Sequence, residues 1–430
     1  MVFDFNKLLA ILVVSFLLGT FALFGLRGSL QRTMLLGLLI GLLFYSGIGG
    51  ADVSVPSSYI ASYFIFFVAV IAGFRVARPV LFPASQAMGR LLPPAFVNID
   101  KIRKWRYVIV AYILLSFFPL IWPEFKLQNL ISLEVPDLGS LFLREFVREP
   151  DVLTRLFGYL HLLLTPFFYV ALYRLRFQLW WVIALFALLI YVEYSVNAYI
   201  GRSSIMQYIG VFGLSMWWLR PEYRHKIYIF GVVALPLLLY GFYIYQVIRI
   251  GGVVGDISLL SAVLGVLEIE LGFPKDVGVP IIESAKHVDL ASYFTWILTL
   301  PIPKVLTGPI IGARINYEIS EIVLGTPTGT DGWYVVLPGL VAESIYIYGR
   351  YFFWLHGFFV GALAMLMARI MERSPQMLFL QMNVVLLFAY VLNRAGIGAV
   401  LPLLVNQFLM FYILLLIVAS RERRRRRRNF

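Results

Sequence analysis

The sequence predicts an all-α, polytopic integral membrane protein with about eleven transmembrane helices, in a range of about 10 to 14. Hydrophobic residues make up 61% of its 430 residues and charged residues only 14%, whereas about a quarter of the residues of a soluble domain are charged. Apolar segments of about twenty residues recur along the chain, and each is long enough to cross a bilayer as a helix. A long segment rich in Gly, Pro, Tyr and charge interrupts them, and we expect it to form one large external insert.

The predicted spans fall into two groups on either side of this insert. They are expected at 7–25, 33–49, 58–77, 106–122, 156–173, 177–199, 203–219 and 226–247, and then at 350–371, 376–393 and 396–420. Two apolar regions are not counted. Prolines interrupt 79–97, so it is not expected to span. The segment 334–349 contains Pro338, Gly339 and Glu343 and is expected to form a re-entrant or interfacial piece.

The placement of positive charge predicts the orientation. The net charge of +13 is concentrated in short loops and in the terminal run Arg421–Arg428. Cytoplasmic loops of membrane proteins are enriched in Lys and Arg, so the C-terminus and the basic loops at 75–106, 174–176 and 220–226 are expected in the cytoplasm. The loops at 50–57, 123–155 and 249–334 carry no such excess and, with the amino terminus, are expected outside.

This orientation divides the chain into four parts. They are a membrane domain over 1–248 with the external loop 123–155, the external insert over 249–334 with short helices, a second membrane part over 335–420, and a basic cytoplasmic tail over 421–430. The first apolar segment lacks a small-residue cleavage site and is interpreted as a retained span. The arginine-rich tail is expected to contact anionic lipids rather than nucleic acid.

Several common catalytic motifs are absent from the sequence. It has no Gly-x-x-x-x-Gly-Lys-Ser/Thr, Gly-x-Gly-x-x-Gly, Asp-x-Asp or His-Glu-x-x-His, which argues against nucleotide hydrolysis, dinucleotide redox chemistry and metalloproteolysis. The chain has no cysteine, and His161, His225, His287 and His356 have no metal-ligand spacing. No metal and no cofactor are therefore expected. His287 is kept as a candidate base because it lies in the insert.

Four cations are predicted to bind an anion at the external face. Arg202 opens a predicted span near the external interface, where a helix amino terminus favours negative charge. Arg249 follows the next hairpin on the same side, and Lys304 and Arg314 belong to the insert. Together they are suited to a diphosphate, since a guanidinium presents a planar fork of donors. The alternative for each residue is simple positioning at the membrane interface.

Two carboxylates are candidates for acid–base chemistry. Glu343 lies in an apolar segment, where an ionisable group suggests function, and it is a candidate general base. The alternative is structural pairing with an arginine, because Glu343, Tyr346 and Arg350 share one helix face. Asp331 lies in a Gly-rich turn and is the other candidate, with a turn residue as the alternative.

Aromatic residues make up 16% of the chain, and several lie in or just after the insert. Trp333, Tyr334 and Tyr346 are the candidates for stacking against sugar rings. The alternative is an interfacial aromatic belt, in which Trp and Tyr are enriched.

The order of these features resembles the O-antigen polymerase (Wzy) family, inner-membrane enzymes that polymerise lipid-linked oligosaccharides. In that family an arginine and a glycine separated by ten residues mark two external loops, and the pairs Arg202–Gly213 and Arg314–Gly325 have this spacing. A Pro-Gly…Glu…Gly segment follows the second pair, from Pro338 through Glu343 to Gly349. Two departures remain: Gly213 falls inside a predicted span, and Pro301-Ile-Pro-Lys304 replaces a more usual Pro-Arg pattern.

The resemblance implies a GT-C-like fold and a metal-independent glycosyltransferase of lipopolysaccharide or other polysaccharide biosynthesis in the bacterial inner membrane. It would transfer a glycan from undecaprenyl diphosphate to a lipid-linked acceptor on the periplasmic face, and its partners would be the bilayer, a chain-length regulator and a flippase. Arg202, Arg314 and Arg249 would neutralise the leaving diphosphate. Glu343 or His287 would accept the proton of the acceptor hydroxyl.

Two other functions remain open from the sequence. An O-antigen ligase-like transferase would share this architecture and use a histidine of the external insert as its base, and His287 fits that description. A lipid-linked oligosaccharide flippase or another transporter would also be basic and polytopic, but transporters usually show related halves and polar residues near the bilayer midplane. Neither feature is evident in this sequence.

Overall fold

The structure is a computed structural model of the 430-residue chain. It describes residues 2–26, 28–91, 105–116, 202–249, 258–300, 302, 315–328, 330, 333–372 and 378–405, together with scattered positions between 160 and 189. All the regular structure within these ranges is helical, apart from one isolated bridge between Phe3 and Asp52. The chain divides into two compact units, and each is described by itself. The first contains 1–85, 256–372 and 384–402, and the second contains 86–255, 373–383 and 403–430.

Three long helices begin the first unit. They are α1 (Phe5–Leu23), α2 (Ser29–Leu42), which continues through short π and 3-10 turns to Ala51, and α3 (Ser57–Leu91), which extends into the second unit. Asp4 caps α1 by accepting from the backbone N–H groups of Asn6 and Lys7. At the other end of α1, Arg75 of α3 donates to the carbonyls of Phe21 and Ala22 at 2.9 and 2.8 Å. A cation there satisfies carbonyls that have no helical partner.

Within its described residues, the insert adds four short helices to the same unit. They are α11 (Leu259–Leu271), α12 (Val279–Ser284), α13 (Leu290–Thr299) and α15 (Ile315–Leu324), with a π turn, η7 (Pro274–Gly278), before α12. The long helix α16 (Leu340–Met371) follows. After it come α17 (Leu378–Leu386), η9 (Leu387–Val391), α18 (Leu392–Ala395) and α19 (Ile397–Leu403), of which α17 begins in the second unit.

The described helices of the second unit are fewer. They are α4 (Trp105–Ser116), α9 (Arg202–Leu219), the 3-10 turn η6 (Pro221–Tyr223) and α10 (Arg224–Arg249). The α9–α10 hairpin turns at Pro221, and Arg224 donates to the carbonyl of Trp217 at 3.0 Å. Within this unit, Gln207 of α9 also donates to Asn383 at 2.6 Å.

The structure confirms a helical, membrane-embedded protein. Within the described ranges, six helices are long and apolar enough to cross a bilayer: Phe5–Leu23, Ser29–Ala51, Ser57–Arg78, Pro221–Ile244, Leu340–Met371 and Leu378–Ala395. Each coincides with a span expected from the sequence. The predicted spans at 106–122, 156–173, 177–199 and 396–420 lie wholly or partly outside the described residues, and the apolar part of α9 is shorter than a span. The count of about eleven stays a prediction.

Two helices extend beyond the spans expected from the sequence. Helix α3 continues past Pro79 and Pro83 to Leu91, although its apolar span ends at Arg78. Within the segment 334–349, Leu340–Tyr348 forms the first part of α16 and is almost entirely buried, and its re-entrant or interfacial placement stays a prediction. It is buried by the insert and the final helices, so its apolar sequence reflects protein packing.

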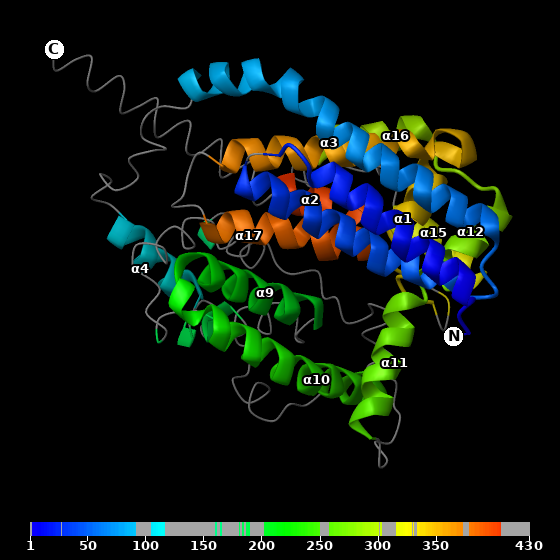
Figure 1. Cartoon of the computed structure of the whole chain (residues 1–430), viewed down its shortest axis with the longest axis horizontal. Coiled ribbons are helices and arrows are strands. Elements are labelled where there is room, and N and C mark those ends of the chain that lie inside the picture. The colour runs from blue at the N-terminus through cyan, green and yellow to red at the C-terminus, as the bar shows by residue number, and fades with distance from the viewer. Residues whose placement is uncertain are drawn as a thin grey trace. The chain divides into compact units, whose positions relative to one another are not determined.

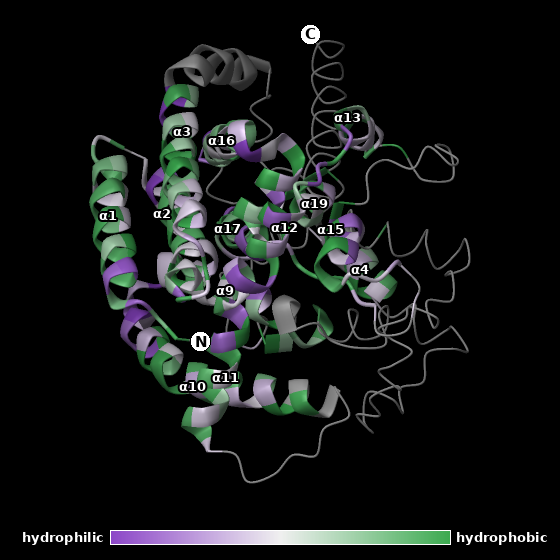
Figure 2. Ribbon diagram, turned by 90° about the vertical axis from the view of Figure 1, so that its right-hand side faces the viewer, coloured by the Kyte–Doolittle hydropathy of each residue, from purple (hydrophilic) through white to green (hydrophobic). Residues whose placement is uncertain are grey.

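Glycines allow the long helices of the first unit to pack closely. Helices α1, α2, α3 and α16 lie side by side (Figure 1), and α1 and the coloured part of α3 are mostly hydrophobic (Figure 2). A Cβ on Gly73 would overlap the carbonyl oxygen of Phe358, and one on Gly361 would overlap that of Val70. Small residues let backbones approach in this way, which provides the dispersion contacts that hold membrane helices together.

Gly361→Leu is expected to destabilise the protein, because the new side chain would meet the backbone of α3 at Val70. Overpacking of this kind costs about 1–3 kcal/mol, so the purified variant should unfold several degrees lower in a thermal melt. Gly231→Leu in α10 is the control, since no heavy atom of the described chain lies within 4 Å of its Cβ position. Equal melting temperatures for the two variants would contradict the close approach of α3 and α16.

Candidate functional site

Helix α16 is broken at Gly349. This residue has φ 73° and ψ 174°, a combination that is open almost only to glycine. The segment before the break is buried, whereas the segment 350–371 contains about 22 residues and is about 33 Å long at 1.5 Å per residue. That length matches the hydrocarbon core of a bilayer. The break therefore lies at one end of a membrane-spanning segment.

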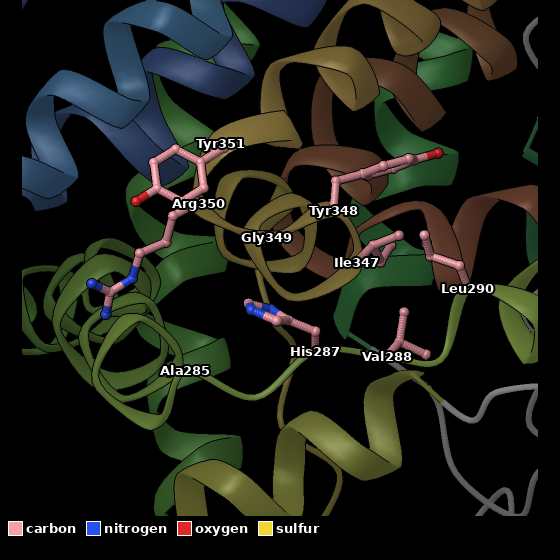
Figure 3. A pocket seen from close by; sticks show the side chains of 9 residues that line it. All are labelled: Ala285, His287, Val288, Leu290, Ile347, Tyr348, Gly349, Arg350 and Tyr351. Carbon is pink, nitrogen blue, oxygen red and sulfur yellow. The ribbon is translucent and has the colours of Figure 1, made fainter.

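A cavity of about 430 Å³ surrounds this break. It is lined by Ala285, His287, Val288, Leu290, Ile347, Tyr348, Gly349, Arg350 and Tyr351 (Figure 3). The first four residues come from the loop between α12 and α13 and from the start of α13, and the others come from α16. Three ring atoms of His287 lie 3.6 to 3.9 Å from the position of a Cβ on Gly349, so the imidazole covers the glycine with its face.

Hydrogen bonds fix the loop against the break. The N–H of Val288 donates to the carbonyl of Tyr346 at 3.1 Å. Arg350 extends away from His287 toward α12 (Figure 3), where it donates to the carbonyl of Ile282. A cation is favourable near the carboxyl end of a helix. Ala285 turns the chain there with a left-handed φ of 51°.

Asp289 fixes the other end of the loop by capping α13. Its carboxylate accepts from the hydroxyl of Ser292 at 2.7 Å and from the N–H groups of Ser292 and Ala291 at 2.9 and 3.4 Å. The hydrogen bonds that Asp289 accepts from Ser292 lower the pKa of its carboxyl group. The bond from the Ser292 hydroxyl has the largest effect, and the bond from its backbone N–H has the next largest. Because the pKa of Asp289 is lower in the folded state, its ionised carboxylate stabilises the fold at pH values above the ordinary pKa of an aspartate. This stabilisation is lost as the pH falls through the folded pKa.

The pocket combines groups that can perform chemistry with apolar surface. His287 is exposed, and an imidazole can accept or donate a proton near neutral pH. The exposed Arg350 lines the same cavity and carries a permanent positive charge. Leu290, Ile347 and Val288 supply an apolar wall. Such a mixture suits an amphipathic substrate better than a small polar one.

Glu343, a predicted general base, has a buried carboxylate that is hydrogen-bonded to two backbone N–H groups. The residue is fully buried, and its two oxygens accept from the N–H groups of Ile397 at 2.5 Å and Gly398 at 2.9 Å. These groups begin α19, immediately after Gly396 with φ 77° and ψ −176°. Glu343 thus caps a helix that starts inside the protein. The alternative of pairing with Arg350 is wrong, since that guanidinium bonds to Ile282.

The three predicted sugar-stacking residues occupy different environments. Tyr346 is buried, and its hydroxyl donates to Glu318 at 2.6 Å. Trp333 is also buried, packed on Tyr317 with ring centroids 5.2 Å apart, and its indole nitrogen has no hydrogen-bond partner within the part of the chain that is described. Tyr334 is 43% exposed. Of the three, Tyr334 presents the most surface to a ligand.

The predicted cations are only partly described. Arg202 begins α9 and Arg249 ends α10, and their side chains lie outside the description. Lys304, Arg314 and Asp331 lie outside the described residues altogether. Their convergence on a diphosphate, and the role of Asp331, therefore stay predictions. Arg202 and Arg249 belong to the second unit, whereas His287 and Glu343 belong to the first.

The two glycines that carry the resemblance differ in their surroundings. Gly325 has φ 67°, and its N–H donates to the carbonyl of Glu321 at 3.0 Å, so it ends α15 in the left-handed conformation typical of a helix terminus. Gly213 lies inside α9, and nothing in the described chain lies within 4 Å of its Cβ position. Only Gly325 has a conformational requirement for glycine.

Sequence reasoning missed three parts of this region. The pocket residues Tyr348 and Tyr351 carried no signal beyond their aromatic character, and Arg350 was considered only as a partner for Glu343. The bidentate ion pair between Arg394 and Glu270, with N–O distances of 2.7 and 2.8 Å, was also not predicted. Its members are 124 residues apart, so no local pattern connects them.

Comparison with known protein families, with curated proteins and with solved structures finds no match. Among the residues that the structure describes, there is also no group of three or more His, Cys, Asp or Glu side chains that could hold a metal ion.

Replacing Glu343 should separate its capping role from catalysis. Glu343→Ala leaves two buried N–H groups of α19 without an acceptor, at about 1–3 kcal/mol each, so the variant should unfold at a clearly lower temperature. Glu343→Gln keeps one acceptor oxygen and should lose less stability. If Glu343→Ala melted like the wild type but had lost activity, the capping role would be secondary and the general-base prediction would gain support.

Gly349→Ala should destabilise the break, because alanine would be held at φ 73° and ψ 174°. Strain of this kind costs about 1–3 kcal/mol, although the neighbouring His287 ring leaves ordinary van der Waals space for a Cβ. Gly213→Ala is the matched control and should stabilise α9 slightly, since alanine favours a helix interior. Thermal melts of the two variants should therefore shift in opposite directions, and a shift in the same direction would argue against the break.

Proposed function

We propose that this protein is a glycosyltransferase that polymerises lipid-linked oligosaccharide repeat units at the periplasmic face of a bacterial inner membrane. The donor would be a glycan on undecaprenyl diphosphate, and the acceptor a second lipid-linked unit. The pocket at the Gly349 break carries the proposal, because an exposed imidazole and a guanidinium lie beside apolar surface at the end of a span. The resemblance of the Arg202 and Arg314 segments to the O-antigen polymerases supplies the reaction class.

His287 is the better candidate for the base. In the proposed reaction an acceptor hydroxyl attacks the anomeric carbon, the bond from that carbon to the diphosphate oxygen breaks, and the hydroxyl proton passes to the imidazole. His287 is exposed in the pocket, whereas both oxygens of Glu343 are occupied by backbone N–H groups. The negative charge that develops on the diphosphate would be neutralised by Arg202, Arg314, Arg249 and Lys304.

The same observation favours a second candidate function. An O-antigen ligase-like transferase would use a histidine of the external insert as its base, and His287 belongs to the insert and lines the pocket. This enzyme would transfer the finished glycan to a lipid A core, so the two candidates differ in the acceptor. A flippase has no comparable support, because an external pocket with a base is not needed to move a lipid across the membrane.

The proposed topology follows the charge distribution. The basic tail Arg421–Arg428 would lie in the cytoplasm, and the insert with its pocket would lie in the periplasm. A chain-length regulator and a flippase would be functional partners, and nucleic acid would not. No metal and no cofactor are included in the proposed reaction.

The experiment is glycan analysis of a strain that lacks this gene and carries wild-type or variant copies. Deletion should leave core glycan with a single repeat unit, and wild type should restore the ladder. His287→Ala should reduce polymerisation by about 10²-fold or more, the usual contribution of a general base, and Arg202→Ala and Arg314→Ala should also fail to restore it at equal membrane levels.

His225→Ala is the matched control, because His225 is an exposed histidine of α10 on the face expected to be cytoplasmic. It should restore the full ladder. If deletion removed even the single-unit band, the polymerase proposal would give way to the ligase-like function or to a flippase. A full ladder with His287→Ala would exclude this residue as the base.

A further inference from the structure

The short insert helix α13 has one apolar face that is largely exposed. Leu290, Phe294 and Leu298 are 45, 51 and 74% exposed. Residues four apart lie on the same face of a helix, so these side chains form a single stripe, which we call the α13 stripe. With ten residues, α13 is about 15 Å long and cannot cross a bilayer. An exposed apolar stripe on such a helix is a candidate site of contact with a protein or a membrane.

The opposite face of α13 is anchored beside the break in α16. Tyr293 is 2% exposed and packs edge-on against Tyr348, with ring centroids 6.3 Å apart. Trp296 stacks on Tyr293 with ring centroids 5.9 Å apart. Asp289 caps the amino end. The helix is therefore held in one rotational position, with the α13 stripe turned outward.

The α13 stripe and the exposed surface of the span in α16 both reach the cavity at the break. Leu290, the first residue of the stripe, lines the same cavity as Tyr351 of α16 (Figure 3). Directly after the break, Tyr351, Phe352 and Trp354 are 84, 58 and 40% exposed on a helix that crosses the bilayer. Tyr and Trp are enriched at the membrane–water interface. The bilayer surface therefore lies near the pocket, at the level where α13 begins.

We propose that α13 is an interfacial helix that inserts the α13 stripe into the outer edge of the bilayer and forms a lateral opening from the membrane to the His287 pocket. Interfacial helices bind membranes in this way through one apolar face that is buried at the level of the headgroups and the upper acyl chains. The membrane position of α13 is inferred from the exposed α13 stripe and does not depend on the proposed function. The use of the opening by a lipid-linked glycan rests on the proposed function.

The position of α13 is tested with single-cysteine variants, which the chain allows directly because it has no cysteine. Leu298→Cys carries an environment-sensitive fluorophore in proteoliposomes of phosphatidylethanolamine and phosphatidylglycerol. Phe352→Cys on the span is the lipid-exposed reference, and Glu283→Cys at an exposed position of α12 is the aqueous reference. Nitroxide-labelled lipids should quench the labels at 298 and 352, while aqueous iodide should quench the label at 283.

The proposal is overturned if iodide quenches the label at 298 and nitroxide lipids do not. Energy transfer between labels at 298 on two copies, without quenching by lipid, would also overturn it and would assign the α13 stripe to self-association. Phe294→Cys provides a second position if Leu298→Cys does not fold, and it should give the same pattern.

The lateral opening is tested separately in the polymerisation assay. The double variant Phe294→Ser and Leu298→Ser should lower transfer between lipid-linked units roughly tenfold by weakening membrane contact, while Thr295→Ser on the same helix should not. Unchanged transfer in the double variant would refute the opening. If lipid quenches the label at 298 but the wild-type protein performs no transfer, the interfacial helix stands and the proposed function fails.

Discussion

The buried carboxylate of Glu343 is the interaction on which the first unit depends. A backbone N–H without a partner is costly in an apolar surrounding, and a helix that begins inside the protein exposes several. Glu343 supplies acceptors for two of them, from Ile397 and Gly398, and the N–H of Gly339 bonds to the carbonyl of Arg394 nearby. These contacts join the start of α16 to the break at Gly396, between α18 and α19. The pocket at Gly349 is built on this junction.

The spans were predictable from sequence because a segment in contact with lipid consists almost entirely of apolar residues. Hydropathy identified the six described spans with ends that differ by a few residues, except for α16, whose helix begins at Leu340. The breaks at Gly349 and Gly396 were not predictable, because a glycine permits a positive φ without requiring one. The burial of 340–348 within the protein was also not predicted, because an apolar segment has the same composition whether lipid or protein covers it.

The site was predictable only at the level of residue type. His287 was kept because it lies in the insert, and the structure shows it at a pocket. Glu343 was recognised as an ionisable group in an apolar segment, but its partners lie 54 and 55 residues away in the chain and no local pattern reveals them. Arg350 looked like a partner for Glu343 by helical spacing, yet the kink at Gly349 breaks the face on which that reasoning relied.

The ion pair between Glu270 and Arg394 constrains the order in which the protein can be assembled. During synthesis Glu270 emerges 124 residues before the arginine that neutralises it, so this contact can form only after the final helices have been made. Docking of α11 before then would leave a half-buried carboxylate without its cation, which is unfavourable. The insert is therefore not an autonomous module that can be exchanged between related chains. Transplanting it would require the final helices to move with it.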